Sequence, residues 1–128
     1  MRNLYLVIIC ILVFSCGHKK TPQGAKIEFE NTECNVGKIK RGEKANCIFI
    51  IKNSGDSTLI FYNIIPNCDC TSLSNKNIEV PADKTDTLKF VLNTEGKELG
   101  VLESEIRIIT NTIPDLHRLK IIAEIEKK

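Results

Sequence analysis

Two cysteines in one predicted loop, Cys68 and Cys70, are the residues of this chain whose type and spacing are best suited to chemistry. They lie in the stretch Pro66-Asn67-Cys68-Asp69-Cys70-Thr71, between two segments with strand-like alternation. A disulfide, either between them or to another cysteine, would stabilise a small oxidised domain by about 2–4 kcal/mol. Two free thiolates would instead bind a soft metal such as Cu(I) or Zn²⁺, or exchange with other disulfides. The third interpretation is two small buried side chains where a strand bends.

A second pair, Cys34 and Cys47, flanks a predicted tight turn at Lys40-Arg41. If the flanking segments pair as an antiparallel hairpin, Ile39 lies opposite Gly42, and Cys34 lies opposite Cys47. Directly opposed Cβ atoms are about 5 Å apart, which is close enough for a disulfide after local adjustment. Four cysteines allow three pairings, and we expect Cys34–Cys47 before any other.

Other catalytic or metal-binding patterns have little support. A metal site at Cys68 and Cys70 would need further ligands, yet the only methionine is Met1, and the two histidines are His18 and His117. His117 has no serine or cysteine nucleophile at a known motif spacing, and the sequence contains no glycine-rich phosphate loop or zinc-ligand quartet. We therefore expect no enzyme activity, no metal site and no cofactor.

The sequence after residue 26 alternates apolar and polar side chains with the period of β-strands. For example, Ala45, Cys47, Phe49 and Ile51 share one face of a predicted strand. Turn sequences such as Asn53-Ser54-Gly55-Asp56 separate these segments. Seven or eight short strands of this kind predict an all-β fold, an immunoglobulin-like antiparallel β-sandwich of two sheets.

The start of the chain has the features of an exported protein. An apolar run from Leu4 to Phe14 is too short to span a bilayer as a helix, but it is typical of a signal peptide. Ser15-Cys16-Gly17 resembles a bacterial lipobox, which implies cleavage before Cys16 and its lipidation. An ordinary signal peptide with an incidental Cys16 is the alternative. We expect a lipoprotein signal peptide at residues 1–15, lipidated Cys16 and a tether at residues 16–26, and the sandwich domain at residues 27–126.

Four segments of the predicted domain, in order, match the pattern of a known family. They are Asn35-Val36-Gly37-Lys38-Ile39 with Gly42-Glu43, Phe49 to Asp56, Pro66 to Thr71, and Ile109-Thr110-Asn111. Residues 27–125 thus resemble a domain of unknown function found in many bacterial lipoproteins, especially of the Bacteroidetes group, and marked by Pro-Ser-Cys-Gly-Cys-Thr. The resemblance implies an immunoglobulin-like sandwich related to spindle- and cilium-associated domains and to the major sperm protein. It implies no known activity.

One candidate surface for a partner follows from the predicted strands. If the segments 58–65, 101–110 and 118–125 share a sheet, its outer face carries four apolar side chains, namely Ile60, Tyr62, Ile109 and Ile122. Apolar residues on a solvent face mark a partner surface or are isolated surface residues without a function.

Composition and the residue after Cys16 bear on partners and location. A net charge of +2, spread along 128 residues, gives no basis for nucleic-acid binding. No small-molecule substrate is indicated. Gly17 replaces the aspartate that resembles an inner-membrane retention signal, so we expect an outer-membrane lipoprotein that faces the periplasm or the outside.

The function expected from these features is that of a non-catalytic, lipid-anchored module of the cell envelope that contacts another envelope protein. The alternative is a periplasmic thiol-redox or metal-handling protein that acts through Cys68 and Cys70.

Overall fold

The structure is a computed structural model, and it describes residues 23–75 and 79–128. The predicted signal peptide, the lipidation site Cys16 and most of the predicted tether lie outside the described residues. Within the described part, no helix has the length and apolar character needed to cross a membrane.

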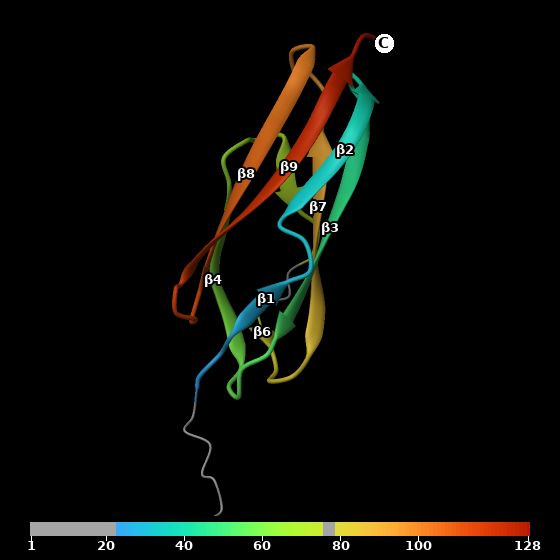
Figure 1. Ribbon diagram of the computed structural model, residues 1–128. Helices are drawn as coiled ribbons and strands as arrows, with labels where there is room; N and C mark the ends of the chain where they lie inside the picture. Colours follow the sequence, from blue (N-terminus) through green and yellow to red (C-terminus); the bar gives the residue numbers. More distant parts are fainter. Residues whose placement is uncertain (1–22, 76–78) are drawn as a thin grey trace, which may run out of the picture.

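The described chain folds into two packed β-sheets, and the immunoglobulin-like sandwich predicted from the sequence is confirmed (Figure 1). The strands are β1 (Ile27–Phe29), β2 (Glu33–Lys40), β3 (Lys44–Asn53), β4 (Leu59–Pro66), β5 (Thr71–Leu73), β6 (Glu79–Val80), β7 (Thr85–Asn93), β8 (Gly100–Thr110) and β9 (Leu116–Glu126). One sheet has the order β1-β3-β7-β5, and the other has the order β2-β9-β8-β4-β6. All neighbouring strands are antiparallel except β2 and β9, which are parallel.

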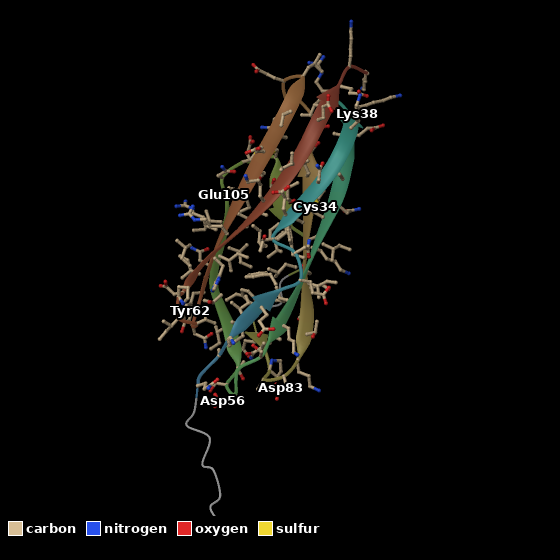
Figure 2. The ribbon with its side chains drawn as sticks, viewed as in Figure 1. Cys34, Lys38, Asp56, Tyr62, Asp83 and Glu105 are labelled. Atoms are coloured by element: carbon tan, nitrogen blue, oxygen red, sulfur yellow. A yellow bond between two sulfur atoms is a disulfide. The ribbon has the colours of Figure 1, made fainter. Side chains whose placement is uncertain are left out.

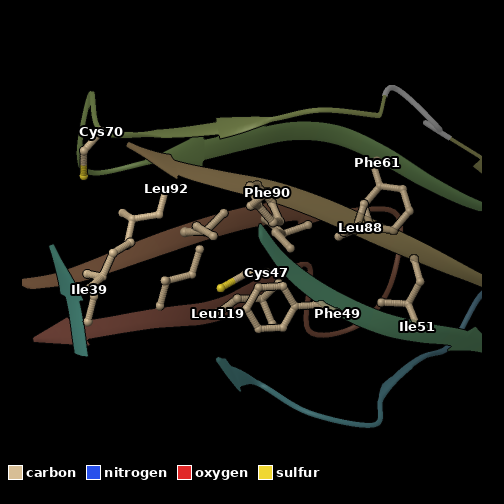
Figure 3. Packing of buried hydrophobic residues seen from close by; sticks show 14 of the residues in the cluster. Ile39, Cys47, Phe49, Ile51, Phe61, Cys70, Leu88, Phe90, Leu92 and Leu119 are labelled. Carbon is tan, nitrogen blue, oxygen red and sulfur yellow. The ribbon is translucent and has the colours of Figure 1, made fainter. Parts of the chain in front are cut away.

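The core lies between the two sheets and is built by alternate residues of the long strands (Figure 3). Phe49 of β3 and Phe90 of β7 are fully buried, and their rings meet nearly edge to face at a centroid distance of 5.9 Å. From the facing sheet, Ile106, Leu119 and Ile121 fill the space opposite them. The period-two pattern therefore predicts correctly which side chains point inward.

The predicted hairpin between residues 34 and 47 is wrong. After the turn at Arg41 and Gly42 the chain crosses to the other sheet, so β2 and β3 are not hydrogen-bonded neighbours. β2 pairs with β9, with Cys34 opposite Ile121, and β3 pairs with β7, with Cys47 opposite Phe90. Both strands keep their inward faces, but alternation alone does not specify which strand provides the hydrogen-bonding partner.

The segment that leads into β1 is held against the turn between β3 and β4. Asn53, whose side chain is fully buried, accepts hydrogen bonds from the backbone nitrogens of Lys26 (3.2 Å) and Gly55 (3.1 Å). It donates to the carbonyl oxygens of Ser57 (2.8 Å) and Val80 (2.9 Å). One side chain thus joins the start of the described chain, the β3–β4 turn and strand β6.

Asp56 adds a second attachment for the same segment. Its two carboxylate oxygens accept hydrogen bonds from the backbone nitrogens of Gln23 (2.8 Å) and Gly24 (2.9 Å). These bonds, above all that from Gln23, lower the pKa of Asp56 below its ordinary value. Figure 2 shows Asp56 and Asp83 at one end of the sandwich and Lys38 at the other. The described chain therefore begins at the end that carries Asp56.

We predict that Gly55→Ala weakens this attachment. A Cβ atom at position 55 would overlap the carbonyl oxygen of Gly24 and lie 2.6 Å from the Lys26 nitrogen. Because both are backbone atoms, relief requires the incoming segment to move, at a cost of about 1–3 kcal/mol. Urea unfolding should report this loss, and the amides of Lys26 and Ile27 should exchange faster with solvent. Thr58→Ala, at an exposed neighbouring position, is the control and should change stability by less than about 0.5 kcal/mol. A Gly55→Ala protein with wild-type stability and exchange would contradict the prediction.

Candidate functional site

Cys34 and Cys47 form a disulfide that connects the two sheets. Their Cα atoms are 6.0 Å apart, and the bond closes a loop with a sequence separation of 13. Cys47 is fully buried in the core, whereas Cys34 is half-buried on the edge strand β2. A loop of this length corresponds to about 3 kcal/mol of stabilisation through the unfolded chain. The position of this disulfide indicates a structural role.

Cys68 and Cys70 form a second disulfide, within the loop between β4 and β5. Their Cα atoms are 5.1 Å apart, and the backbone nitrogen of Cys70 lies 3.2 Å from the Cys68 sulfur. Cys70 is buried, whereas Cys68 is half-buried. A ring this short restricts the unfolded chain much less, by about 1.5 kcal/mol on the same scale. This disulfide therefore stabilises the fold less than Cys34–Cys47 does.

Polar contacts hold the loop around the second disulfide. The Asp69 carboxylate accepts a hydrogen bond from the Lys97 ammonium at 2.6 Å, and this bond lowers the pKa of Asp69. On the buried side, the Thr71 hydroxyl donates to the Ser104 hydroxyl on β8 at 2.7 Å. The chemistry available to this arrangement is disulfide exchange at Cys68, the less buried of the two cysteines. In the part of the chain that the structure describes, no three metal-ligating side chains gather at one point.

The four residues of the expected partner surface fall in two places. β4, β8 and β9 share one sheet, as expected, and Ile60, Tyr62 and Ile109 gather on its outer face. A bulge between Phe61 and Asn63 inserts Tyr62 into the strand, and its side chain is 64% exposed. Ile122 is separated from them, because it lies between Asn35 of β2 and Glu103 of β8.

Two further apolar residues, which were not predicted from the sequence, extend the group formed by Ile60, Tyr62 and Ile109. Leu116 lies directly opposite Ile109 across the β8–β9 pair, and Ile113 projects from the turn between the two strands with its side chain fully exposed. Ile60 joins the same turn, because its backbone exchanges hydrogen bonds with Asn111. We name this group the apolar corner: Ile60, Tyr62, Ile109, Ile113 and Leu116. The signal in the sequence that could have identified them was the presence of two apolar side chains, Ile113 and Leu116, in and directly after an otherwise polar turn.

The apolar corner lies beside the start of the described chain. A shallow groove of about 430 Å³ is lined by the segment 23–26 on one side and by Asn111 and Ile113 on the other. The segment held by Asn53 and Asp56 therefore runs next to the β8–β9 turn. Tyr62 lies toward the same end of the molecule as Asp56 in Figure 2.

The acidic residues of β8 are paired with basic residues of β9 on the outer face. Glu105 accepts a hydrogen bond from Arg118 at 2.7 Å, and Glu103 lies 3.7 Å from the Lys120 ammonium. Cross-strand ion pairs of this kind stabilise a surface only slightly. They do not form a catalytic pair.

His117 faces inward beneath the β8–β9 turn. Its Nε2 atom lies 2.8 Å from the Thr112 hydroxyl, and its ring is 5.7 Å from the ring of Phe29. Partial burial lowers the pKa of His117 below its ordinary value, against the opposing influence of the Pro114 carbonyl and the Asp115 carboxylate. The neutral imidazole is therefore the form that suits the folded protein.

We predict that the free energy of unfolding decreases as the pH falls below about 6.5, the ordinary pKa of histidine. In the folded state the pKa of His117 is depressed, so the unfolded chain binds the proton first and acid favours unfolding. Urea unfolding followed by circular dichroism at about pH 7.5 and about pH 5.5 measures this loss. His117→Gln should reduce the difference between the two values. Equal pH dependence in the wild type and in His117→Gln would contradict the assignment.

Several solved structures share the sandwich. A protein of unknown function from Porphyromonas gingivalis W83 matches with a TM-score of 0.70 and 20% identity, over 86% of this chain and 51% of that one. The ASH/PapD-like domain 7 of human CEP192 matches with a TM-score of 0.68 and 9% identity, over 84% and 90% of the two chains. The periplasmic chaperone SfaE matches with a TM-score of 0.58 and 11% identity, over 79% and 57%. At these identities the likeness establishes the fold alone.

The chain spans about half the length of the Porphyromonas protein. No curated protein is significantly similar to it in sequence. A family model, by contrast, matches residues 27–125, which cover both sheets and both disulfides. The chain belongs to the family described as "Protein of unknown function (DUF1573)".

Proposed function

We propose that this chain is a non-catalytic module of the cell envelope that is anchored to a membrane by lipid on Cys16 and acts through contacts of its surface. The observation that carries the proposal is the order of features along the chain. An apolar run and Ser15-Cys16 precede by only a few residues a segment that is held at one end of a rigid sandwich. Such a chain would present its domain close to the membrane.

The surface of the described domain supports a role in contact. Exposed apolar side chains lie at both ends of the domain, in the apolar corner and at Leu99 on the β7–β8 connection and Val101 at the start of β8. We propose that one partner is another protein of the envelope, and that the anchor lies in the outer membrane.

We predict that Cys16→Ser abolishes lipidation, because the thiol is the proposed site of acylation. The wild-type protein should enter the detergent phase on phase partitioning, and mass spectrometry should find acyl groups on its first peptide. Cys16→Ser should move to the aqueous phase or remain uncleaved and without acyl groups. Cys10→Ser, within the apolar run, is the matched control and should behave as the wild type does. Wild-type protein without acyl groups at Cys16 would disprove the anchor.

A second function, thiol-disulfide exchange, is favoured by the Cys68–Cys70 disulfide. It stabilises the fold less than Cys34–Cys47 does, and Cys68 is half-exposed in its loop. Accessible disulfides with little structural role are the ones that exchange with thiols.

We predict that mild reductant opens Cys68–Cys70 in the folded protein before Cys34–Cys47, because Cys68–Cys70 closes only its own loop whereas Cys34–Cys47 links the two sheets across the core. Titration with glutathione, followed by alkylation and mass spectrometry, gives the reduced fraction of each pair. Cys34–Cys47 is the internal control and should remain oxidised until the protein unfolds. Simultaneous reduction of both pairs would argue against exchange at this loop.

A further inference from the structure

The apolar corner is a concentration of exposed apolar surface at one place in the fold. Tyr62 is 64% exposed, Leu116 is 40% exposed, and the Ile113 side chain is fully exposed. These are half of the six large apolar side chains that are exposed in the described part of the chain. Gathered exposure of this kind indicates a contact surface, whereas single exposed apolar residues do not.

The side chains next to the apolar corner change from apolar to basic along the strands, as side chains at a membrane interface do. Arg107 of β8 and Arg118 of β9 are directly opposite each other, two residues from Ile109 and Leu116 along their strands. Both arginines are exposed, and Arg118 is also ion-paired with Glu105 at 2.7 Å. Along the strands the outer face thus changes from isoleucine and leucine to arginine within about 7 Å. Apolar side chains at the end of a domain, followed by tyrosine and arginine, are suited to the boundary between acyl chains and headgroups. The turn also contains one exposed acid, Asp115.

The position of the corner relative to the proposed anchor limits what can cover it. Gln23 and Gly24 are held by Asp56, and the segment 23–26 faces Ile113 across the shallow groove. Six residues separate Cys16 from Gln23, so the two residues are seven steps apart and at most about 25 Å from each other. The far end of the domain is another strand length away, about 36 Å for the 11 residues of β8. A lipid on Cys16 therefore keeps the corner, and not the far end, near the bilayer.

We propose that the apolar corner rests on the bilayer into which the Cys16 lipid is inserted, with Ile113 and Leu116 among the acyl chains and Tyr62, Arg107 and Arg118 at the headgroups. This assignment rests on the proposed lipid anchor and names the contact made by the corner. Burial of apolar side chains then holds the domain at a defined tilt, and the end with Leu99 and Val101 is turned away from the membrane toward a protein partner.

The absence of tryptophan from the sequence provides a direct test. In Ile113→Trp the new indole is the only one in the protein, and the exposed position tolerates it. The lipidated full-length protein is reconstituted into vesicles of phosphatidylethanolamine and phosphatidylglycerol, with or without brominated acyl chains. We expect the Ile113→Trp emission to shift to the blue and to lose most of its intensity in brominated vesicles.

The matched control is Val101→Trp. The Val101 side chain is 72% exposed and lies at the start of β8. Val101 pairs with Glu124, and Glu124 pairs with Lys38, which Figure 2 places at the end away from Tyr62. The emission of Val101→Trp should stay that of a solvated indole and should be unaffected by brominated acyl chains. Circular dichroism verifies that both variants are folded.

The possible results separate this inference from the anchor. If the vesicles carry the protein on flotation but neither indole is quenched, the corner does not touch lipid and the inference is wrong, whereas the anchor stands. Equal quenching at both positions also overturns it, because the domain then has no defined tilt. A blue shift of Ile113→Trp in native membranes, but not in protein-free vesicles, assigns the corner to a protein partner and overturns the inference. If the wild-type protein does not float with the vesicles, the proposed anchor itself is wrong.

Discussion

The point at which the chain enters the sandwich is determined by one buried amide, and the functional inferences depend on it. Removing a polar side chain from water is costly unless its hydrogen bonds are replaced. Asn53 uses both its donor and its acceptor groups to bind the incoming segment, the β3–β4 turn and β6. Gly55 allows that segment to pass close to the turn, and Asp56 binds its backbone amides. Together these contacts fix the place at which the described chain enters the sandwich.

Because the entry of the chain is fixed at one end of the domain, the two ends would face different surroundings in the proposed anchored protein. The incoming segment lies beside the apolar corner, whereas the β7–β8 connection is at the opposite end of the long strands. The two disulfides also differ in their relation to the fold. Cys34–Cys47 joins the sheets across the core, and Cys68–Cys70 closes only its own loop. The proposed anchor and the apolar corner thus lie at one end of the sandwich, whereas the Cys68–Cys70 loop is attached to the β7–β8 connection at the other end through the Asp69–Lys97 ion pair.

Side-chain alternation was enough to predict the fold class and the inward faces, since burial requires it whichever strands are paired. It did not predict that β2 leaves β3 and pairs in parallel with β9, because that choice depends on contacts between distant residues. The structure bonds Cys34 to Cys47 across the sheets, although the hairpin from which we expected the pair is absent. Ile122 and Ile109 looked equivalent in the sequence, but only register shows that they are far apart along their strands. Ile113 was missed because a turn has no period that distinguishes its exposed side, and Leu116 was missed because it precedes the predicted strand segment 118–125.

The parallel pairing of β2 with β9 has a consequence for biogenesis. β2 is at the edge of its sheet, and its hydrogen-bonded neighbour is the segment Leu116–Glu126. A chain that is synthesised in order from its beginning cannot complete this sheet until that last strand is available. Closing contacts between such distant segments is slow. The sheet that contains β2 is therefore expected to close late, and β2 lacks its hydrogen-bonding partner until β9 arrives.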